Sequence, residues 1–157
     1  MARYRATCDW TLAESGGDFL LGRYGRGHTV AFGSGVRVAG TASAQVVGNK
    51  WAAPDAVDPE EMLVAALSQC HMLSFLHKAR EAGFAVTRYR DEAEGLMEKF
   101  EGDRMMVTKV WLRPQIAYEG ARPTPQQRDD LHHAAHQACF IANSVKTEVV
   151  VEEKEPT

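Results

Sequence analysis

Two cysteines in predicted helices are the residues of this chain best suited to covalent chemistry. Cys70 lies in DPEEMLVAALSQCHMLSF, residues 58–75, and Cys139 lies in LHHAAHQACFIAN, residues 131–143. Packed helix axes lie roughly 8–10 Å apart, so facing cysteines could come within the Cα separation of about 4.4–6.8 Å that a disulfide requires. Free cysteines in helices more often act as small buried hydrophobic residues. The spacing alone leaves both interpretations open.

A metal site is a second chemistry that the same region could support. His132, His136 and Cys139 follow one another at spacings of four and three residues, which places them on one face of a helix. Cys70 or His71 could complete a tetrahedral set of nitrogen and sulfur ligands. The C-x-x-C pairs typical of structural zinc sites are absent from the sequence, and partly exposed histidines would give the same pattern. The metal site therefore stays an alternative.

The element that must position Cys70 is predicted to be a long helix. Asp58 can cap it, Pro59 suits its first position, and two glutamates follow at its positive end. Gly83 supplies a stop, which predicts a helix over about 59–82. Apolar residues recur within it every three or four positions: Leu63, Ala66, Leu67, Cys70 and Leu73. Cys70 is therefore expected on or beside the apolar face.

The remaining segments are predicted to be strands around one more helix. In the first 50 residues, short apolar or alternating apolar and polar runs are separated by glycine-rich turns. This pattern is typical of an antiparallel meander. Thr124, Pro125 and Gln127 are typical of a capping box that opens a helix. The expected elements after Gly83 are a hairpin turning at 101–103, a helix at about 125–142 and a strand at 145–153. The fold class is therefore α+β in a single domain, residues 1–157.

Composition excludes several classes of function. The 157 residues are 45% hydrophobic and carry a net charge of −3, with basic residues scattered along the chain. We therefore expect no nucleic-acid partner. No segment approaches the roughly 20 apolar residues of a membrane span, and the first residues lack the apolar core of a signal peptide. Three cysteines are too few for a disulfide scaffold, so a cytoplasmic location with free thiols is expected.

Two motifs resemble those of the OsmC/Ohr family of osmotically inducible and organic hydroperoxide resistance proteins. PEEMLVAALSQCHMLSFLHKAREAGF is similar to the family's first cysteine motif, and AHQACFIANSVKTEV, residues 135–149, is similar to its second. The order of the predicted elements matches the family over nearly the whole chain. The resemblance implies the OsmC-like α+β fold in an intertwined homodimer.

The resemblance also implies an activity. It implies a cysteine-based peroxidase, a peroxiredoxin-like oxidoreductase of oxidative-stress defence, that reduces organic hydroperoxides without a metal or other cofactor. Cys70 matches the peroxidatic position, Cys139 the resolving position, and Glu60 the acidic residue. An arginine completes the family's site; Arg26 is the favoured match, with Arg23 and Arg37 as alternatives. The family suggests that an external dithiol of the lipoyl type would reduce the redox-active disulfide.

The distance between two of these residues has a consequence for assembly. Glu60 and Cys70 are ten residues apart, which is about 15 Å along one straight helix. They cannot share a site within one such helix, so either the helix breaks or a second chain supplies the glutamate. Two copies packed antiparallel would build two equivalent sites across a twofold axis. We therefore predict sites at a dimer interface.

Two positions depart from the family pattern. His71 stands where well-known members have an aromatic residue, and Phe140 stands where they often have proline. His71 points about 100° away from Cys70 around the helix, so it is expected to line a pocket or face the surface rather than act as a base. A rival interpretation keeps the fold but makes the chain a binding protein for a small apolar ligand, with incidental cysteines.

Overall fold

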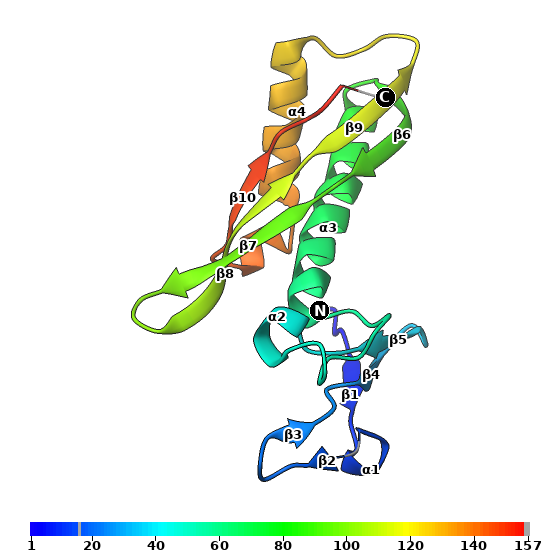
Figure 1. Cartoon of the computed structure of the whole chain (residues 1–157). Coiled ribbons are helices and arrows are strands. Elements are labelled where there is room, and N and C mark those ends of the chain that lie inside the picture. Colours follow the sequence, from blue (N-terminus) through cyan, green and yellow to red (C-terminus); the bar gives the residue numbers. More distant parts are fainter. Residues whose placement is uncertain (16, 156–157) are drawn as a thin grey trace. The chain divides into compact units, whose positions relative to one another are not determined.

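Helix α3 (Pro59–Glu81) runs for 23 residues through the middle of the chain (Figure 1). The computed structural model describes residues 1–15 and 17–155, and the chain forms two compact units, residues 1–62 and 63–157. Short strands dominate the first unit, and helices packed on strands make up the second. The predicted α+β class is confirmed.

The start of α3 follows from its first residues. The backbone N–H of Glu61 donates to the carboxylate of Asp58 at 2.8 Å, and the N–H of Asp58 donates to the carboxylate of Glu61 at 3.1 Å. This reciprocal pair satisfies two donors that a helix start leaves free. Gly83 adopts a φ of 83° two residues after the helix ends. The predicted bounds agree with the structure to one residue.

The first unit holds a small antiparallel sheet with strand order β1-β4-β5. Its strands are β1 (Ala6–Asp9), β4 (His28–Phe32) and β5 (Arg37–Gly40), and a separate pair is formed by β2 (Gly17–Asp18) and β3 (Arg23–Tyr24). Two single-turn helices, α1 (Leu12–Ser15) and α2 (Ala44–Val47), interrupt the predicted meander. Period-two alternation does not reveal such turns; α2 forms because the Ser43 hydroxyl accepts from the N–H of Gln45.

The predicted hairpin is present in the second unit, and each of its arms is divided in two. Strands β7 (Glu94–Phe100) and β8 (Arg104–Leu112) pair around the tight turn at Glu101 and Gly102, both at positive φ. Strands β6 (Ala85–Asp91) and β9 (Pro114–Glu119) pair beyond the break. The last strand, β10 (Glu148–Val151), is shorter than predicted and runs parallel to β8, which gives the order β10-β8-β7.

Helix α4 (Pro125–Ala138) begins with the predicted capping box between Thr124 and Gln127. It ends four residues before the predicted end, because Cys139 leaves the helical conformation with a ψ of 107° and caps the helix. A short 3₁₀ turn, η1 (Ala142–Ser144), follows. Cys139 therefore lies at a helix end rather than inside the helix.

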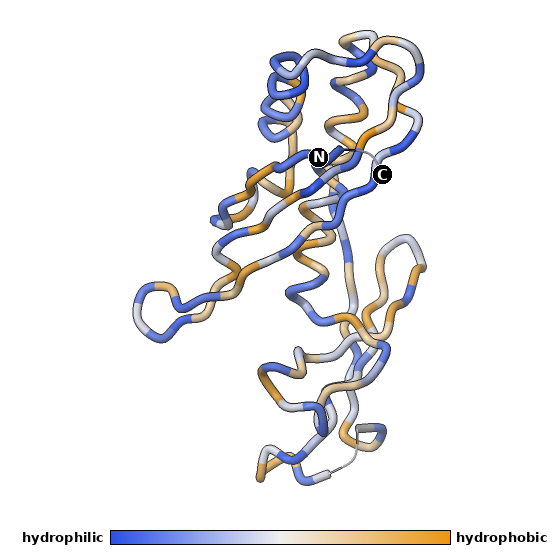
Figure 2. The backbone as a smooth tube through the Cα atoms, turned by 45° about the horizontal axis from the view of Figure 1, so that its top comes forward, coloured by the Kyte–Doolittle hydropathy of each residue, from blue (hydrophilic) through white to orange (hydrophobic). Residues whose placement is uncertain are grey.

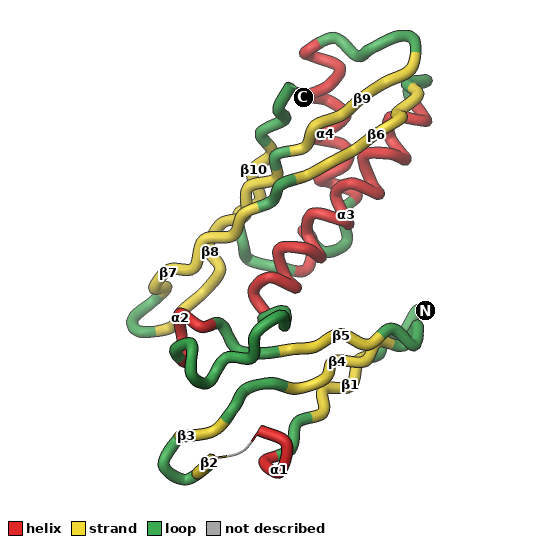
Figure 3. Tube along the Cα trace, turned by 45° about the vertical axis from the view of Figure 1, so that its right-hand side comes forward, coloured by secondary structure: helices red, strands yellow, loops and turns green. Residues whose placement is uncertain are grey.

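Helices α3 and α4 lie side by side and cover one face of the strands of the second unit (Figure 3). One buried cluster joins Phe75 and Ala79 of α3 to Leu131 of α4 and Ile116 of β9. The other buried cluster joins Leu67 to the inner face of β8. Hydrophilic residues cover much of α4 and the turn between β7 and β8 (Figure 2).

The buried stripe of α3 differs from the predicted one. Its fully buried residues repeat every four positions: Leu67, His71, Phe75 and Ala79. Leu73, which the sequence pattern placed on the apolar face, is 60% exposed. The pattern overlooked His71 because histidine does not count as apolar. Within the described residues, no helix is both long enough and apolar enough to cross a membrane.

Candidate functional site

The structure brings the thiols of Cys70 and Cys139 together between α3 and the end of α4. Cys70 is partly exposed, whereas Cys139 is buried with 1% of its surface accessible. Burial raises the pKa of the Cys139 thiol, and the neighbouring Cys70 thiol raises that pKa further. Cys139 therefore keeps its proton in the reduced pair.

Local backbone structure holds Cys139 in this place. Its N–H donates to the carbonyl of His136 at 3.1 Å, and its carbonyl accepts from the N–H of Asn143 at 3.1 Å. The N–H of Ala142 donates to its sulfur at 3.4 Å. Ala142 in turn packs against the buried cluster that contains Leu67. The thiol thus has a fixed position against α3.

Two buried histidines and a glutamate form a hydrogen-bonded chain that joins α3, α4 and the C-terminal segment. Nε2 of His71 lies 3.0 Å from Nδ1 of His132, and Nε2 of His132 lies 2.8 Å from Oε2 of Glu153. The exposed fractions of the two histidines are 1% and 8%. Burial, aided by nearby His132 and His136, lowers the pKa of His71 from 6.5 to about 4. His71 is therefore neutral at pH 7.

This position corrects the expectation for His71. Its ring lies in the interface of the two helices, 5.3 Å from that of His132, rather than at the surface. The four-residue repeat from Leu67 to Phe75 was the sequence signal that could have placed it there. Glu153 gave no such signal, because it lies 21 residues after His132 in a segment predicted only as a strand.

The alternative metal site does not form from the predicted ligands. Both ring nitrogens of His132 already have hydrogen-bond partners, His71 and Glu153. The described residues contain no group of three or more His, Cys, Asp or Glu side chains placed to hold a metal ion. The side chain of His132 is held by His71 and Glu153, and the sulfur of Cys139 accepts from the N–H of Ala142.

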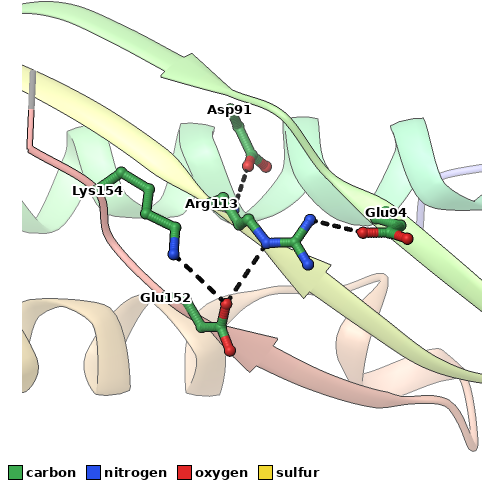
Figure 4. A network of polar contacts seen from close by, with 5 residues as sticks. All are labelled: Asp91, Glu94, Arg113, Glu152 and Lys154. Atoms are coloured by element: carbon green, nitrogen blue, oxygen red, sulfur yellow. Dashed lines mark hydrogen bonds and ion pairs between the residues drawn. The ribbon is translucent and has the colours of Figure 1, made fainter. Parts of the chain in front are cut away.

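A polar network fixes α3 to the strands near Cys70. The hydroxyl of Ser68 donates to Oδ2 of Asp91 at 2.5 Å, and Oδ1 of Asp91 accepts from the backbone N–H of Arg113 at 2.6 Å. The guanidinium of Arg113 binds Glu94 at 2.8 Å and Glu152 at 3.4 Å (Figure 4). These contacts lie where each hairpin arm is broken, so they join β6, β7, β8 and the C-terminal segment.

The favoured arginine, Arg26, lies in the first unit. Its guanidinium stacks 3.5 Å above the ring centroid of Tyr24 and donates to the carbonyl of the same residue. Arg23 in β3 and Arg37 in β5 are exposed. Glu60 lies in the first turn of α3, and among the described residues of the chain no ion pair joins it to Arg26.

Arg26 also lines an open hollow in the first unit with a volume of about 330 Å³. The rings of Trp10 and Tyr24 meet edge to face at 5.5 Å, and Phe19 lies 4.7 Å from Tyr24. The full lining consists of Trp10, Phe19, Tyr24, Arg26, His28, Thr41, Ala42 and Pro59. One cation beside three aromatic rings suits an apolar group with a polar or anionic end.

Comparisons with known proteins agree with this architecture. Residues 52–154 match the family model described as OsmC-like protein. An OsmC-like protein of unknown function from Vibrio cholerae is 43% identical, with a TM-score of 0.92 over 98% of this chain and 100% of that one. No curated protein matches the chain.

More distant structures share the fold. An organic hydroperoxide resistance protein from Elizabethkingia anophelis is 18% identical, with a TM-score of 0.69 over 100% of this chain and 97% of that one. One from Bacillus subtilis is 16% identical, with a TM-score of 0.65 over 98% of each chain. The residues that match the family model, 52–154, include Cys70 and Cys139 and nearly all of the second unit. This chain belongs to the OsmC-like family.

Proposed function

We propose that this protein is a thiol-dependent peroxidase that reduces organic hydroperoxides in oxidative-stress defence. Cys70 is the peroxidatic cysteine, and Cys139 is the resolving cysteine. The observation that carries the proposal is that Cys139 is buried and that the partly exposed Cys70 lies close enough to raise the pKa of its thiol. The shared fold with organic hydroperoxide resistance proteins supports the substrate class.

The different environments of the two thiols support their separate roles. The nucleophile in peroxide reduction is a thiolate, and it must be reachable by the substrate. Cys70 is partly exposed, whereas Cys139 is buried, and the pKa of its thiol is raised, so that it keeps its proton. Cys70 is therefore the thiol that meets the peroxide first.

The proposed chemistry proceeds in two steps. The Cys70 thiolate attacks the O–O bond, which leaves sulfenic acid on Cys70 and releases the substrate as an alcohol after the alkoxide takes up a proton. Cys139 then condenses with the sulfenic acid: the S–S bond forms, the S–O bond breaks and water leaves. An external dithiol of the lipoyl type would reduce the disulfide and become a disulfide itself.

Arg26 and Glu60 complete the proposed site in a cytoplasmic homodimer. A guanidinium near Cys70 would favour the thiolate and could hydrogen-bond the peroxide. Glu60 would orient this arginine from the partner chain. The experiment is sedimentation of the full chain together with activity of Glu60→Gln. A fully active monomer would contradict the shared site.

The activity is tested by adding one equivalent of cumene hydroperoxide to the reduced protein and counting free thiols. We expect rapid loss of two thiols, a mass decrease of about 2 Da, and a Cys70–Cys139 disulfide in peptide maps. Cys8→Ser is the matched control, because Cys8 is exposed in β1, and it should react like the parent. Survival of both thiols in folded protein under excess peroxide would refute the proposal.

A second candidate is binding of a small apolar ligand without peroxide chemistry. The aromatic hollow beside Arg26 favours it. Under this candidate, Cys70→Ser would keep ligand affinity and Tyr24→Ala would lose it, while the parent would reduce no peroxide. Titration of medium-chain fatty acids against intrinsic tryptophan fluorescence would separate the two candidates.

A further inference from the structure

The aromatic hollow of the first unit has charge of one sign in its lining. Among the described residues that line it, Arg26 is the one lysine or arginine, and none is acidic. The whole lining lies within residues 1–62, so one compact unit sets its geometry. In the other unit, a hollow of about 340 Å³ is lined by Lys78 and Glu81, which pair at 2.9 Å. The aromatic hollow therefore attracts anions, whereas the second hollow holds a neutral pair.

The backbone of Arg26 is held on both sides. Its N–H donates to the carbonyl of Trp51 at 2.8 Å. Its carbonyl accepts from Nδ1 of His28 at 2.8 Å, and Nδ1 must be the donor because a carbonyl oxygen only accepts. Gly40 leaves room for that imidazole, since a Cβ atom at this position would overlap Nε2 of His28. Both backbone polar groups of Arg26 are thus fixed before a ligand binds, which lowers the entropy cost of binding.

The guanidinium of Arg26 keeps donors available for an anion. Of its two terminal nitrogens, Nη1 donates to the carbonyl of Tyr24, and one face of the group lies over the ring of the same residue. Within residues 1–15 and 17–155, no carboxylate forms an ion pair with Arg26. The planar fork of N–H donors matches the two oxygens of a carboxylate. Arg26 therefore favours a ligand with a carboxylate.

The walls of the hollow favour a hydrocarbon. The indole N–H of Trp10 already donates to the carbonyl of Gly25 at 3.0 Å, and the hydroxyl of buried Thr41 is bonded to backbone groups. These polar groups are satisfied and need nothing from a ligand. The remaining surface is aromatic, with ring centroids 4.7 to 5.9 Å apart in Trp10, Phe19 and Tyr24. Such rings stabilise an apolar body by burying its surface.

We propose that this hollow binds one small amphipathic monocarboxylate per chain, with the carboxylate on Arg26 and the hydrocarbon against the aromatic rings. A cation would be repelled by Arg26, and a wholly apolar ligand would leave its donors unpaired. The volume of about 330 Å³ is near the lower end of ligand pockets, roughly 300 Å³, so the ligand is small. This inference rests on the second candidate function, whose ligand it assigns to a chemical class, and it involves neither thiol.

The test is isothermal titration calorimetry of the reduced full chain with octanoate, octanol and octylammonium, which share one hydrocarbon chain. We expect octanoate to bind once per chain and about tenfold more tightly than octanol, because hydrogen bonds between charged groups are stronger than those to a hydroxyl. Octylammonium should bind most weakly. Equal affinities for octanoate and octanol would overturn the carboxylate class and leave the apolar site. Binding of neither would overturn both.

Three variants assign the contacts. Arg26→Gln should lose the preference for octanoate and bind octanol like the parent, which also shows that the hollow is folded. Arg23→Gln is the matched control, because Arg23 is exposed on β3 and lies outside the lining, and it should keep the preference. Phe19→Ala should weaken both probes alike. A preference that survives in Arg26→Gln, or that disappears in Arg23→Gln, would contradict the role of Arg26.

NMR of the unmutated protein locates the ligand without a variant. The indole of Trp10 lies in the wall of the hollow, whereas that of Trp111 belongs to β8 of the other unit. Octanoate should shift the indole N–H signal of Trp10 and leave that of Trp111 unchanged. A shift of Trp111 without one of Trp10 would overturn the site. Failure of cumene hydroperoxide to consume thiols would remove the peroxidase proposal and leave this inference standing.

Discussion

The hydroxyl of Ser68 donates to the carboxylate of Asp91 at 2.5 Å, which connects α3 to the end of β6 two residues before Cys70. The same carboxylate accepts from the backbone N–H of Arg113. One side chain therefore fixes both the helix that carries the proposed nucleophile and the break between β8 and β9. This relationship gives a first prediction on stability.

Asp91→Asn should lower the free energy of unfolding by about 1–3 kcal/mol, because an amide cannot accept at both positions. Ser68→Ala should cost about 1 kcal/mol, and the double variant should cost less than the sum. Urea unfolding followed by circular dichroism measures each value. Glu92→Gln is the control, since its ion pair with Arg90 is exposed and should contribute little. Equal losses in Asp91→Asn and Glu92→Gln would contradict the connecting role.

Gly95 on β7 allows α3 to approach the sheet. A Cβ atom at Gly95 would lie 2.6 Å from Cγ2 of Val64, which is too close for a stable contact. Gly95→Ala should therefore destabilise the protein by about 1–3 kcal/mol, although alanine is ordinarily better than glycine in a strand. Thermal unfolding checks the sign. Addition of Val64→Ala should recover part of the loss.

Gly33→Ala is the matched control for this clash. Its added Cβ would come no closer than 3.5 Å to any neighbour, an ordinary contact. We expect a change within about 0.5 kcal/mol. If Gly95→Ala were as mild as Gly33→Ala, the helix would not depend on the close approach.

Burial of neutral His71 makes stability depend on pH. The unfolded chain binds a proton at this histidine below about pH 6.5, whereas the folded chain binds it only near pH 4. Proton uptake therefore favours unfolding within this window. The contribution is fully present above pH 6.5 and is lost as pH falls toward 4, by an amount on the order of 3 kcal/mol at most.

Urea unfolding at several pH values measures this slope. His71→Leu should be less stable at pH 7, because His132 loses a hydrogen-bond partner, but its stability should fall less steeply between about pH 6.5 and 4.5. His77→Gln, an exposed histidine on the same helix paired with Glu81, should keep the parent slope. If the stability of His71→Leu depended on pH as steeply as that of the parent, a group other than His71 would be responsible for the dependence.

Local signals in the sequence predicted much of the fold. The capping residues before α3 and α4 act through contacts three positions apart, so Asp58 and Thr124 identified both helix starts. The end of α4 was missed because Cys139 terminates it without a glycine. The direction of β10 was beyond the sequence pattern, since parallel pairing with β8 depends on a partner about 40 residues away.

The candidate site likewise combines residues that local sequence signals identify with residues that only tertiary contacts bring together. Cys70 and Cys139 could be proposed as a pair because each lies in a segment that resembles a cysteine motif of the family. The chain of His71, His132 and Glu153 could not be predicted, because Glu153 reaches His132 only after the C-terminal segment has passed the end of β10. Sequence spacing indicates the face of a helix, whereas this contact depends on tertiary packing of α3, α4 and the C-terminal segment.

Loss of the resolving thiol should convert the proposed enzyme into one that inactivates itself. In Cys139→Ser, peroxide should oxidise Cys70 to a sulfenic acid that no thiol can capture, adding about 16 Da and then about 32 Da as sulfinic acid forms. Cys70→Ser should gain neither mass, because buried Cys139 keeps its proton and is poorly reachable.

Intact mass over a peroxide titration, with dimedone to trap the sulfenic acid, measures these products. Cys8→Ser should form the disulfide as the parent does. Stable disulfide formation in Cys139→Ser would identify Cys8 as the resolving thiol instead. Oxidation confined to Cys139 in the Cys70→Ser variant would reverse the two roles.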